Sequence, residues 1–149
     1  MALSSYYCFA YVAAMSDNGQ PLLLPPTRAR IESLALEALA RLPDPFRSHL
    51  SNVVLFVEEF ADEQILKEMG IDDPFGLTGL YSGRPVGEPV QTGDSPPTVH
   101  LFRRPLLDEW VETGVPLDAL ITHVVVHEIG HHFGLSDVDM QVLEDMVAP

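Results

Sequence analysis

Two histidines and a glutamate near the C-terminal end of the sequence have the spacing of a metal site. His127 and His131 are four residues apart, so on a helix, which turns about 400° over that distance, their imidazoles project from one face. Two such imidazoles can bind one divalent metal at about 2.0–2.1 Å each. Glu128 lies about 100° further round the helix. There it is placed to take a proton from a metal-activated water and does not itself bind the metal.

A third ligand is expected just beyond this helix. Gly134 can adopt a positive φ, which lets the chain leave the helix and turn back toward the metal. Asp137, six residues after His131, can then supply an oxygen at about 2.0–2.2 Å. Three protein ligands leave the fourth position of a tetrahedral zinc ion to water, and an open position is typical of catalytic sites.

The prediction depends on these residues lying on a helix. Residues 121–126 are rich in β-branched side chains and are also compatible with a buried strand. Length favours the helix, because Pro116 at its first position and Gly134 just past its end bracket about 18 residues, too many for one strand.

The segment resembles the small bacterial zincin-like metallopeptidases, also called minimal zincins. Their motif, HExxHxxGxxD, stands here as His127, Glu128, His131, Gly134 and Asp137. The resemblance extends over 31–146 and includes a leucine–proline helix end at 42–43, a phenylalanine–arginine pair at 46–47, the strand at 53–58 and the GLYSG segment at 79–83. It implies a compact α+β fold with a small mixed or antiparallel sheet packed against helices. It also implies one Zn²⁺ bound by two histidines and one aspartate, with Glu128 as general base.

Three further residues are candidates for substrate binding. Tyr81 and Arg84 lie in an irregular segment rich in glycine and proline, 72–97, and can stabilise a tetrahedral oxyanion. His132 follows the second metal-ligand histidine and is expected to pair with Glu128 one turn earlier, or to interact with the helix dipole. Packing is the alternative role for Tyr81. Because few residues follow Asp137, segment 72–97 is also expected to form the second wall of the cleft.

The other polar candidates have simpler explanations. His123 lies one turn before His127, but a straight helix cannot easily wrap three histidines around one metal, so we expect a supporting or core-edge position. His100 is predicted on a strand, partly exposed. Cys8 has no matched histidine base and lies outside the motif, so no cysteine-protease chemistry is indicated.

Periodicity and helix-stop residues predict the remaining elements. The first predicted element is a helix capped by Thr27, and a buried strand follows it. Next come a helix ending at Gly70, a strand that turns back on itself, and a short strand. The last three elements are a helix, the motif helix and a closing helix capped by Ser136. The corresponding ranges are 28–42, 53–57, 61–69, 80–86, 98–103, 106–112, 116–134 and 136–146, with a helical turn at 46–50.

Composition restricts the class of protein. The chain has 149 residues with 22 acidic and 8 basic side chains, a formal charge of −14 that disfavours nucleic acid and anionic membrane surfaces as partners. No apolar run is long enough to span a bilayer, and one cysteine excludes an internal disulfide framework. We expect one domain over 28–149 and a cytoplasmic location. Residues 1–27 are interpreted as an N-terminal extension, either an artefact of an upstream start codon or a loosely packed arm.

These observations predict a zinc metallopeptidase that hydrolyses a peptide or protein substrate. Two alternatives remain open: a metal-binding protein without hydrolytic activity, and a regulatory protein-interaction module that retains the fold. The oligomeric state cannot be read from the sequence.

Overall fold

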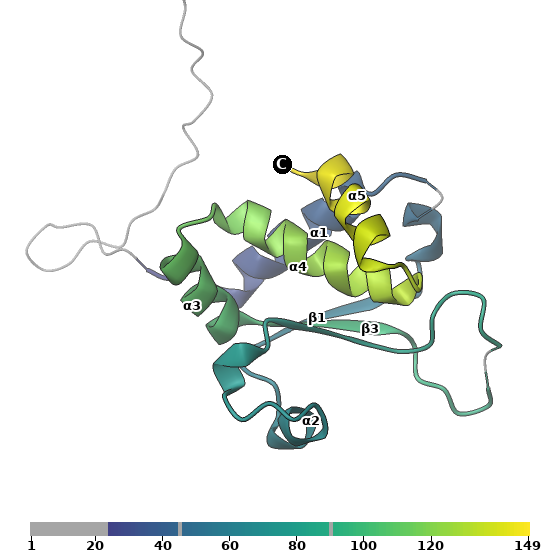
Figure 1. Ribbon diagram of the computed structural model, residues 1–149, viewed down its shortest axis with the longest axis horizontal. Coiled ribbons are helices and arrows are strands. Elements are labelled where there is room, and N and C mark those ends of the chain that lie inside the picture. Colours follow the sequence, from purple (N-terminus) through teal and green to yellow (C-terminus); the bar gives the residue numbers. More distant parts are fainter. Residues whose placement is uncertain (1–23, 45, 90) are drawn as a thin grey trace, which may run out of the picture.

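A computed structural model describes residues 24–44, 46–89 and 91–149, and shows an α+β fold (Figure 1). The described part contains five α-helices, two short 3₁₀ helices and a three-stranded mixed sheet, which confirms the predicted fold class. The elements in chain order are α1 (Arg28–Arg41), η1 (Arg47–His49), β1 (Val54–Glu58), α2 (Glu63–Glu68), η2 (Pro74–Gly76), β2 (Gly79–Ser82), β3 (Thr98–Phe102), α3 (Arg103–Thr113), α4 (Leu117–His132) and α5 (Asp137–Val147).

The sheet has the order β1-β3-β2, with β3 in the centre. β1 runs parallel to β3 and pairs Phe56 with His100, whereas β2 runs antiparallel to β3 and pairs Tyr81 with Val99. The strand expected at 53–57 is therefore an edge strand, and the expectation that it is buried was wrong. Its residues alternate between exposed and half-buried, with Val54 and Phe56 exposed, because helices cover only one face of the sheet at this edge.

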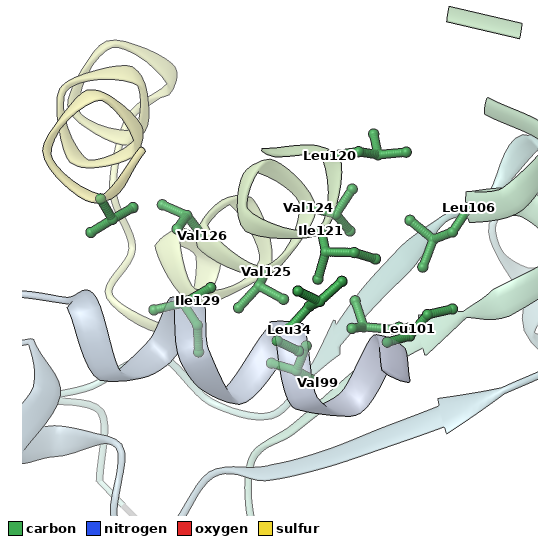
Figure 2. Packing of buried hydrophobic residues seen from close by; sticks show 14 of the residues in the cluster. Leu34, Val99, Leu101, Leu106, Leu120, Ile121, Val124, Val125, Val126 and Ile129 are labelled. Atoms are coloured by element: carbon green, nitrogen blue, oxygen red, sulfur yellow. The ribbon is translucent and has the colours of Figure 1, made fainter. Parts of the chain in front are cut away.

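The core lies between β3 and the helices α1 and α4. Figure 2 shows Leu34 of α1 and Val99 and Leu101 of β3 meeting Ile121 and Val125 of α4. All five side chains are buried, and burial of an aliphatic side chain of this size contributes about 1.5–3 kcal/mol. Segment 121–126 is helical as predicted, because α4 packs against α1 on one side and α5 on another and buries β-branched residues around most of its circumference.

Helix α4 ends in a glycine turn that sets the start of α5. Gly134 has φ of 63°, the N–H of Leu135 donates to the Gly130 carbonyl at 3.0 Å, and the N–H of Gly134 donates to the His131 carbonyl at 3.1 Å. This is the Schellman arrangement that a glycine just beyond a helix end permits. The predicted role of Gly134 is confirmed, and Ser136 caps α5 by accepting from the N–H of Asp139. Asp137 is consequently the first residue of α5.

Several boundaries differ from those predicted. The strand expected at 80–86 does not turn back on itself. β2 ends at Ser82 and pairs with β3, because the following glycine and prolines form a loop. α3 begins directly at Arg103, three residues before the predicted start. Pro116 is the N-cap of α4 and does not occupy its first turn. Thr27 and Asp62 cap α1 and α2 through their side chains, and Gly70 follows α2 with a positive φ.

The interpretation of the N-terminal extension falls mainly on residues 1–23, which lie outside the described residues, as does Cys8. At the end of that extension, the Pro26 carbonyl accepts from the Nε of Arg103 at 2.7 Å. Within the described ranges, no helix has the length and apolar character that crossing a bilayer requires.

Candidate active site

A cleft runs between the C-terminal half of α4 and the edge strand β2. It has a volume of about 470 Å³ and brings Glu128 and His131 of α4 opposite β2 and the residues that precede and follow it. Its lining residues are Met69, Leu77, Gly79, Leu80, Tyr81, Gly83, Pro85, Glu128 and His131. Six of them, from Leu77 to Pro85, belong to segment 72–97, so the prediction that this segment supplies the second wall is confirmed.

Glu128 is held at the base of this cleft by the backbone of β2. The residue is 9% exposed, and its Oε2 accepts a hydrogen bond from the backbone N–H of Tyr81 at 2.7 Å. Burial raises the pKa of the Glu128 carboxyl above its usual range, while the Tyr81 N–H and the neighbouring His131 and His127 act in the opposite direction. A carboxyl with a raised pKa can both accept and return a proton near neutral pH, as a general base and acid must.

His127 and His131 come together on the same face of α4. Their ring centroids are 5.0 Å apart, with the planes at 86° to one another, and His131 is exposed at the cleft. Two imidazoles one turn apart provide the ligand type that zinc favours. Asp137 is exposed on the first turn of α5. No group of three or more His, Cys, Asp or Glu side chains in the described ranges is arranged to hold a metal ion. The donor types fit zinc, but Asp137 is not assembled with the two histidines.

His123 lies outside the cleft. Its ring centroid is 6.2 Å from that of His127, and its Nδ1 lies 2.9 Å from Oε2 of Glu144 in α5. The side chain is 57% exposed, which differs from the core-edge position expected for it, and its contact joins α4 to α5. The side chain of Glu144 is 13% exposed.

His132 does not pair with Glu128, and this expectation was wrong. The His132 side chain is 3% exposed, and its Nδ1 lies 2.8 Å from the hydroxyl of Tyr81, the residue whose backbone N–H binds Glu128. Burial lowers the pKa of His132, so the ring is neutral at pH 7, although the His49 backbone acts in the opposite direction. Its Nε2 has no partner of good hydrogen-bond geometry among the described residues.

The hydroxyl of Tyr81 and the guanidinium of Arg84 are both engaged with protein groups. The Tyr81 hydroxyl donates to the Arg84 carbonyl at 2.8 Å. The Arg84 side chain lies 2.9 Å from a carboxylate oxygen of Asp94 and 3.8 Å from one of Glu88. His100, on the opposite face of the sheet, contacts Glu58 at 2.8 Å and stacks on Phe56. None of these contacts places a second charge beside Glu128.

Two features of the site were not identified from the sequence. The first is the backbone N–H of Tyr81, which binds the carboxyl of Glu128 across 47 residues of sequence. The second is Gly79, where a Cβ atom would lie 3.3 Å from Oε1 of Glu128 and 2.7 Å from Cγ1 of Val124. A glycine inside a strand indicates close approach of another group, but Gly79 lies just before the strand predicted at 80–86, so this signal was not recognised.

Together these features define a class of protein: an α+β domain in which an HExxH helix packs beside the edge strand of a small mixed sheet. A profile of the zincin-like metallopeptidase family matches residues 50–147, and the chain belongs to this family. The chain is also similar to the endoribonuclease YbeY of Chromohalobacter salexigens, with 30% identity over 125 residues that cover 83% of this chain and 77% of the relative.

Proposed function

We propose that this protein is a zinc-dependent peptidase in which Glu128 is the general base. The observation that supports this most strongly is the position of Glu128, a buried carboxyl at the base of a cleft, beside His131, with one oxygen fixed by the backbone of β2. Binding a structural metal does not require a buried carboxyl next to the first histidine, whereas hydrolysis requires a base there.

His127, His131 and Asp137 are the residues that would hold one zinc ion. Asp137 is the residue that must move, because it is exposed and lies apart from the two histidines, whereas the imidazoles already face each other. When bound, zinc would polarise the scissile carbonyl and make a water molecule more acidic.

The remaining chemistry belongs to Glu128. Its carboxylate accepts a proton as the water oxygen forms a bond to the carbonyl carbon of the substrate. The same carboxyl then returns this proton to the amide nitrogen as the carbon–nitrogen bond breaks, so that an acid and an amine are released. The substrate-binding roles of Tyr81, Arg84 and His132 remain predictions, since each side chain has protein partners that a substrate would have to displace.

The cleft favours a peptide over an RNA substrate. Its wall is largely apolar, from Met69, Leu77, Leu80 and Pro85, and no lysine or arginine is among its described lining residues. RNA binding depends on cationic side chains that neutralise phosphates, and the net charge of −14 opposes it. RNA cleavage is nevertheless the second candidate, because a relative with 30% identity is named an endoribonuclease.

The deciding experiment compares the wild type with Glu128→Gln on a mixed peptide library and on a structured RNA, with and without a chelator. We expect the wild type to cleave peptides, the chelator to abolish cleavage, and Glu128→Gln to bind zinc normally while losing roughly 10²- to 10⁴-fold in rate. Cleavage of RNA alone would transfer the proposal to phosphodiester chemistry. A fully active Glu128→Gln protein would remove Glu128 from its role.

Two alternatives without catalysis are separated by the same samples. A passive zinc-binding protein binds the metal and cleaves neither substrate, and an interaction module does not bind zinc. A cytoplasmic location is part of the proposal, since a single cysteine suits a reducing compartment. Fractionation of cells that express the protein at its natural level tests this location.

A further inference from the structure

We propose that β2 is the device that positions the general base: Gly79 makes room for the Glu128 carboxyl and the backbone of Tyr81 fixes one of its oxygens, while the Tyr81 side chain is clamped to the end of α4. This inference rests on the proposed role of Glu128. It makes Gly79, Tyr81 and His132 positioning residues and assigns none of them a direct step in catalysis.

The first element of the device is the close approach of β2 to α4 at Gly79. A Cβ atom at this position would lie 2.7 Å from Cγ1 of Val124, 3.2 Å from Cγ of Glu128 and 3.3 Å from Oε1 of Glu128. The first distance is shorter than van der Waals contact allows. Any side chain here therefore displaces Val124, the Glu128 side chain or the strand itself.

The second part of the arrangement is that the two carboxylate oxygens of Glu128 have different surroundings. Oε2 accepts from the Tyr81 N–H at 2.7 Å, so the carboxyl plane is fixed from one side. Oε1 faces the space that the missing side chain of Gly79 leaves open. The N–H of Tyr81 is available because β2 is an edge strand, paired with β3 on one side only.

The third element holds Tyr81 itself in place. Its hydroxyl donates to the Arg84 carbonyl at 2.8 Å and also lies 2.8 Å from Nδ1 of His132. The N–H of Val86 also donates to the His132 carbonyl at 2.7 Å. These contacts tie the loop after β2 to the last turn of α4, the helix that carries Glu128.

The same contacts argue against a direct catalytic role for the Tyr81 hydroxyl. A hydroxyl has one proton to donate, and the Arg84 carbonyl already receives it. Burial, together with the negative charge of Glu88, raises the pKa of Tyr81, so this proton is retained near neutral pH. The hydroxyl therefore serves to hold β2 against α4.

The principal test is Gly79→Ala, with Gly76→Ala as the matched control. At Gly76 an added Cβ meets only Cγ2 of Ile71, at 3.5 Å, so the same substitution three residues away is accommodated. We expect Gly79→Ala to lower kcat roughly 10- to 100-fold, because a displacement of the order of 1 Å at the base has this effect. KM and zinc affinity stay within about twofold of the wild type, and Gly76→Ala behaves as the wild type in all three. Loss of zinc binding, or equal losses in both variants, would overturn the proposal.

A second set of variants keeps the proposal testable if Gly79→Ala does not fold. Tyr81→Phe removes the hydroxyl and keeps the backbone N–H, and His132→Phe removes the other side of the same contact. If both act through one contact, the double variant loses no more kcat than the more affected single variant. Additive losses would indicate a separate, direct role for the hydroxyl and would contradict the proposal.

A readout independent of activity separates failure of this inference from failure of the proposed function. The Tyr81 amide proton is measured by NMR in the metal-free protein, in the wild type and in Glu128→Ala. Loss of a carboxylate acceptor shifts this proton upfield more than any other amide of β2. If the shift occurs and the wild type cleaves nothing, the proposal that β2 positions the Glu128 carboxyl is supported and the peptidase proposal is wrong. If the Tyr81 amide does not respond, the device is wrong whatever the activity.

Discussion

At the scale of single residues, the four histidines of α4 have different environments although three of them form one column. His127 and His131 make an edge-on ring contact and His131 lines the cleft, His123 pairs with Glu144, and His132 is buried against Tyr81. The type and spacing of these residues alone do not separate them. Their contacts with residues on other elements distinguish them. From these contacts we expect the same substitution to have different effects at different histidines.

The first prediction compares His131→Ala with His123→Ala. Removing a metal ligand should weaken zinc binding by more than about 100-fold, since even loss of a group that supports a ligand costs about 10- to 100-fold. His123→Ala removes only an exposed contact with Glu144 and should leave zinc affinity unchanged. Competition with a chromophoric chelator measures both affinities. Equal affinities for zinc in the two variants would contradict the assignment of His131.

The second prediction concerns the third ligand. Asp137 and Asp139 both lie in the first turn of α5, so replacing either with alanine removes one favourable charge from that helix end, worth about 0.3–1 kcal/mol. Only Asp137→Ala should reduce zinc affinity. Asp139→Ala also removes the contact with the Ser136 hydroxyl, so it is the more severe test of α5 stability. A zinc titration of both variants measures their affinities. If Asp137→Ala retains full affinity for zinc, the third metal ligand must be another residue.

At the scale of elements, the turn between α4 and α5 sets the position of Asp137, the proposed third metal ligand. Gly134 and Gly114 both follow helices with φ near 65°, and a Cβ at either would meet no atom within 4 Å. Their replacement by alanine therefore introduces backbone strain without a steric clash, about 1 kcal/mol in the free energy of unfolding for each.

This pair supplies the third prediction. Gly134→Ala and Gly114→Ala should lower the midpoint of denaturant unfolding by similar amounts, measured by circular dichroism. Only Gly134→Ala should also weaken zinc binding, because its strain falls on the turn that places Asp137. Gly114 follows α3 and is the control for the loss of stability alone. If both variants bind zinc as the wild type does, the turn is not needed to present the third ligand.

The elements also show where reasoning from sequence succeeds. α1, α4 and α5 were predicted with one capping residue each, because Thr27, Gly134 and Ser136 act within three residues of the groups they satisfy. The exposure of β1 was not predicted, because whether a strand is central or at an edge depends on the pairing of 54–58 with 98–102, which local periodicity does not encode. The strand expected at 80–86 was extended too far because the glycine and prolines after Ser82 form a loop.

In the candidate site, too, local features could be predicted from the sequence and contacts between elements could not. His127, Glu128 and His131 were predicted as site residues because the spacing along one helix places them together. The contact between Glu128 and the backbone of Tyr81 joins two elements through a main-chain group, so no residue type at position 81 signals it. The burial of His132 against Tyr81 likewise depends on how β2 lies across α4. Tertiary contacts of this kind determine which of two adjacent histidines faces the cleft.

At the scale of the whole molecule, the net charge of −14 acts on whatever approaches the cleft. Within the described ranges, the cleft wall is apolar and its ionisable side chains are those of Tyr81, Glu128 and His131. Close contacts in the cleft therefore provide little selection by charge. Selection by charge must come from the field of the surrounding surface, which acts over a distance and is screened by salt.

The last prediction tests this field. Two peptides with the same apolar residues around the scissile bond, one flanked by lysines and one by glutamates, should differ in kcat/KM by up to roughly tenfold in favour of lysine at low salt. Because the screening length falls from about 30 Å at 0.01 M to about 3 Å at 1 M salt, the difference should disappear as sodium chloride is raised. The kcat values should stay alike, since the field affects encounter and leaves Glu128 unchanged. A preference for the glutamate-flanked peptide, or one that persists in high salt, would mean that specific contacts at the cleft, and not the net charge, select the substrate.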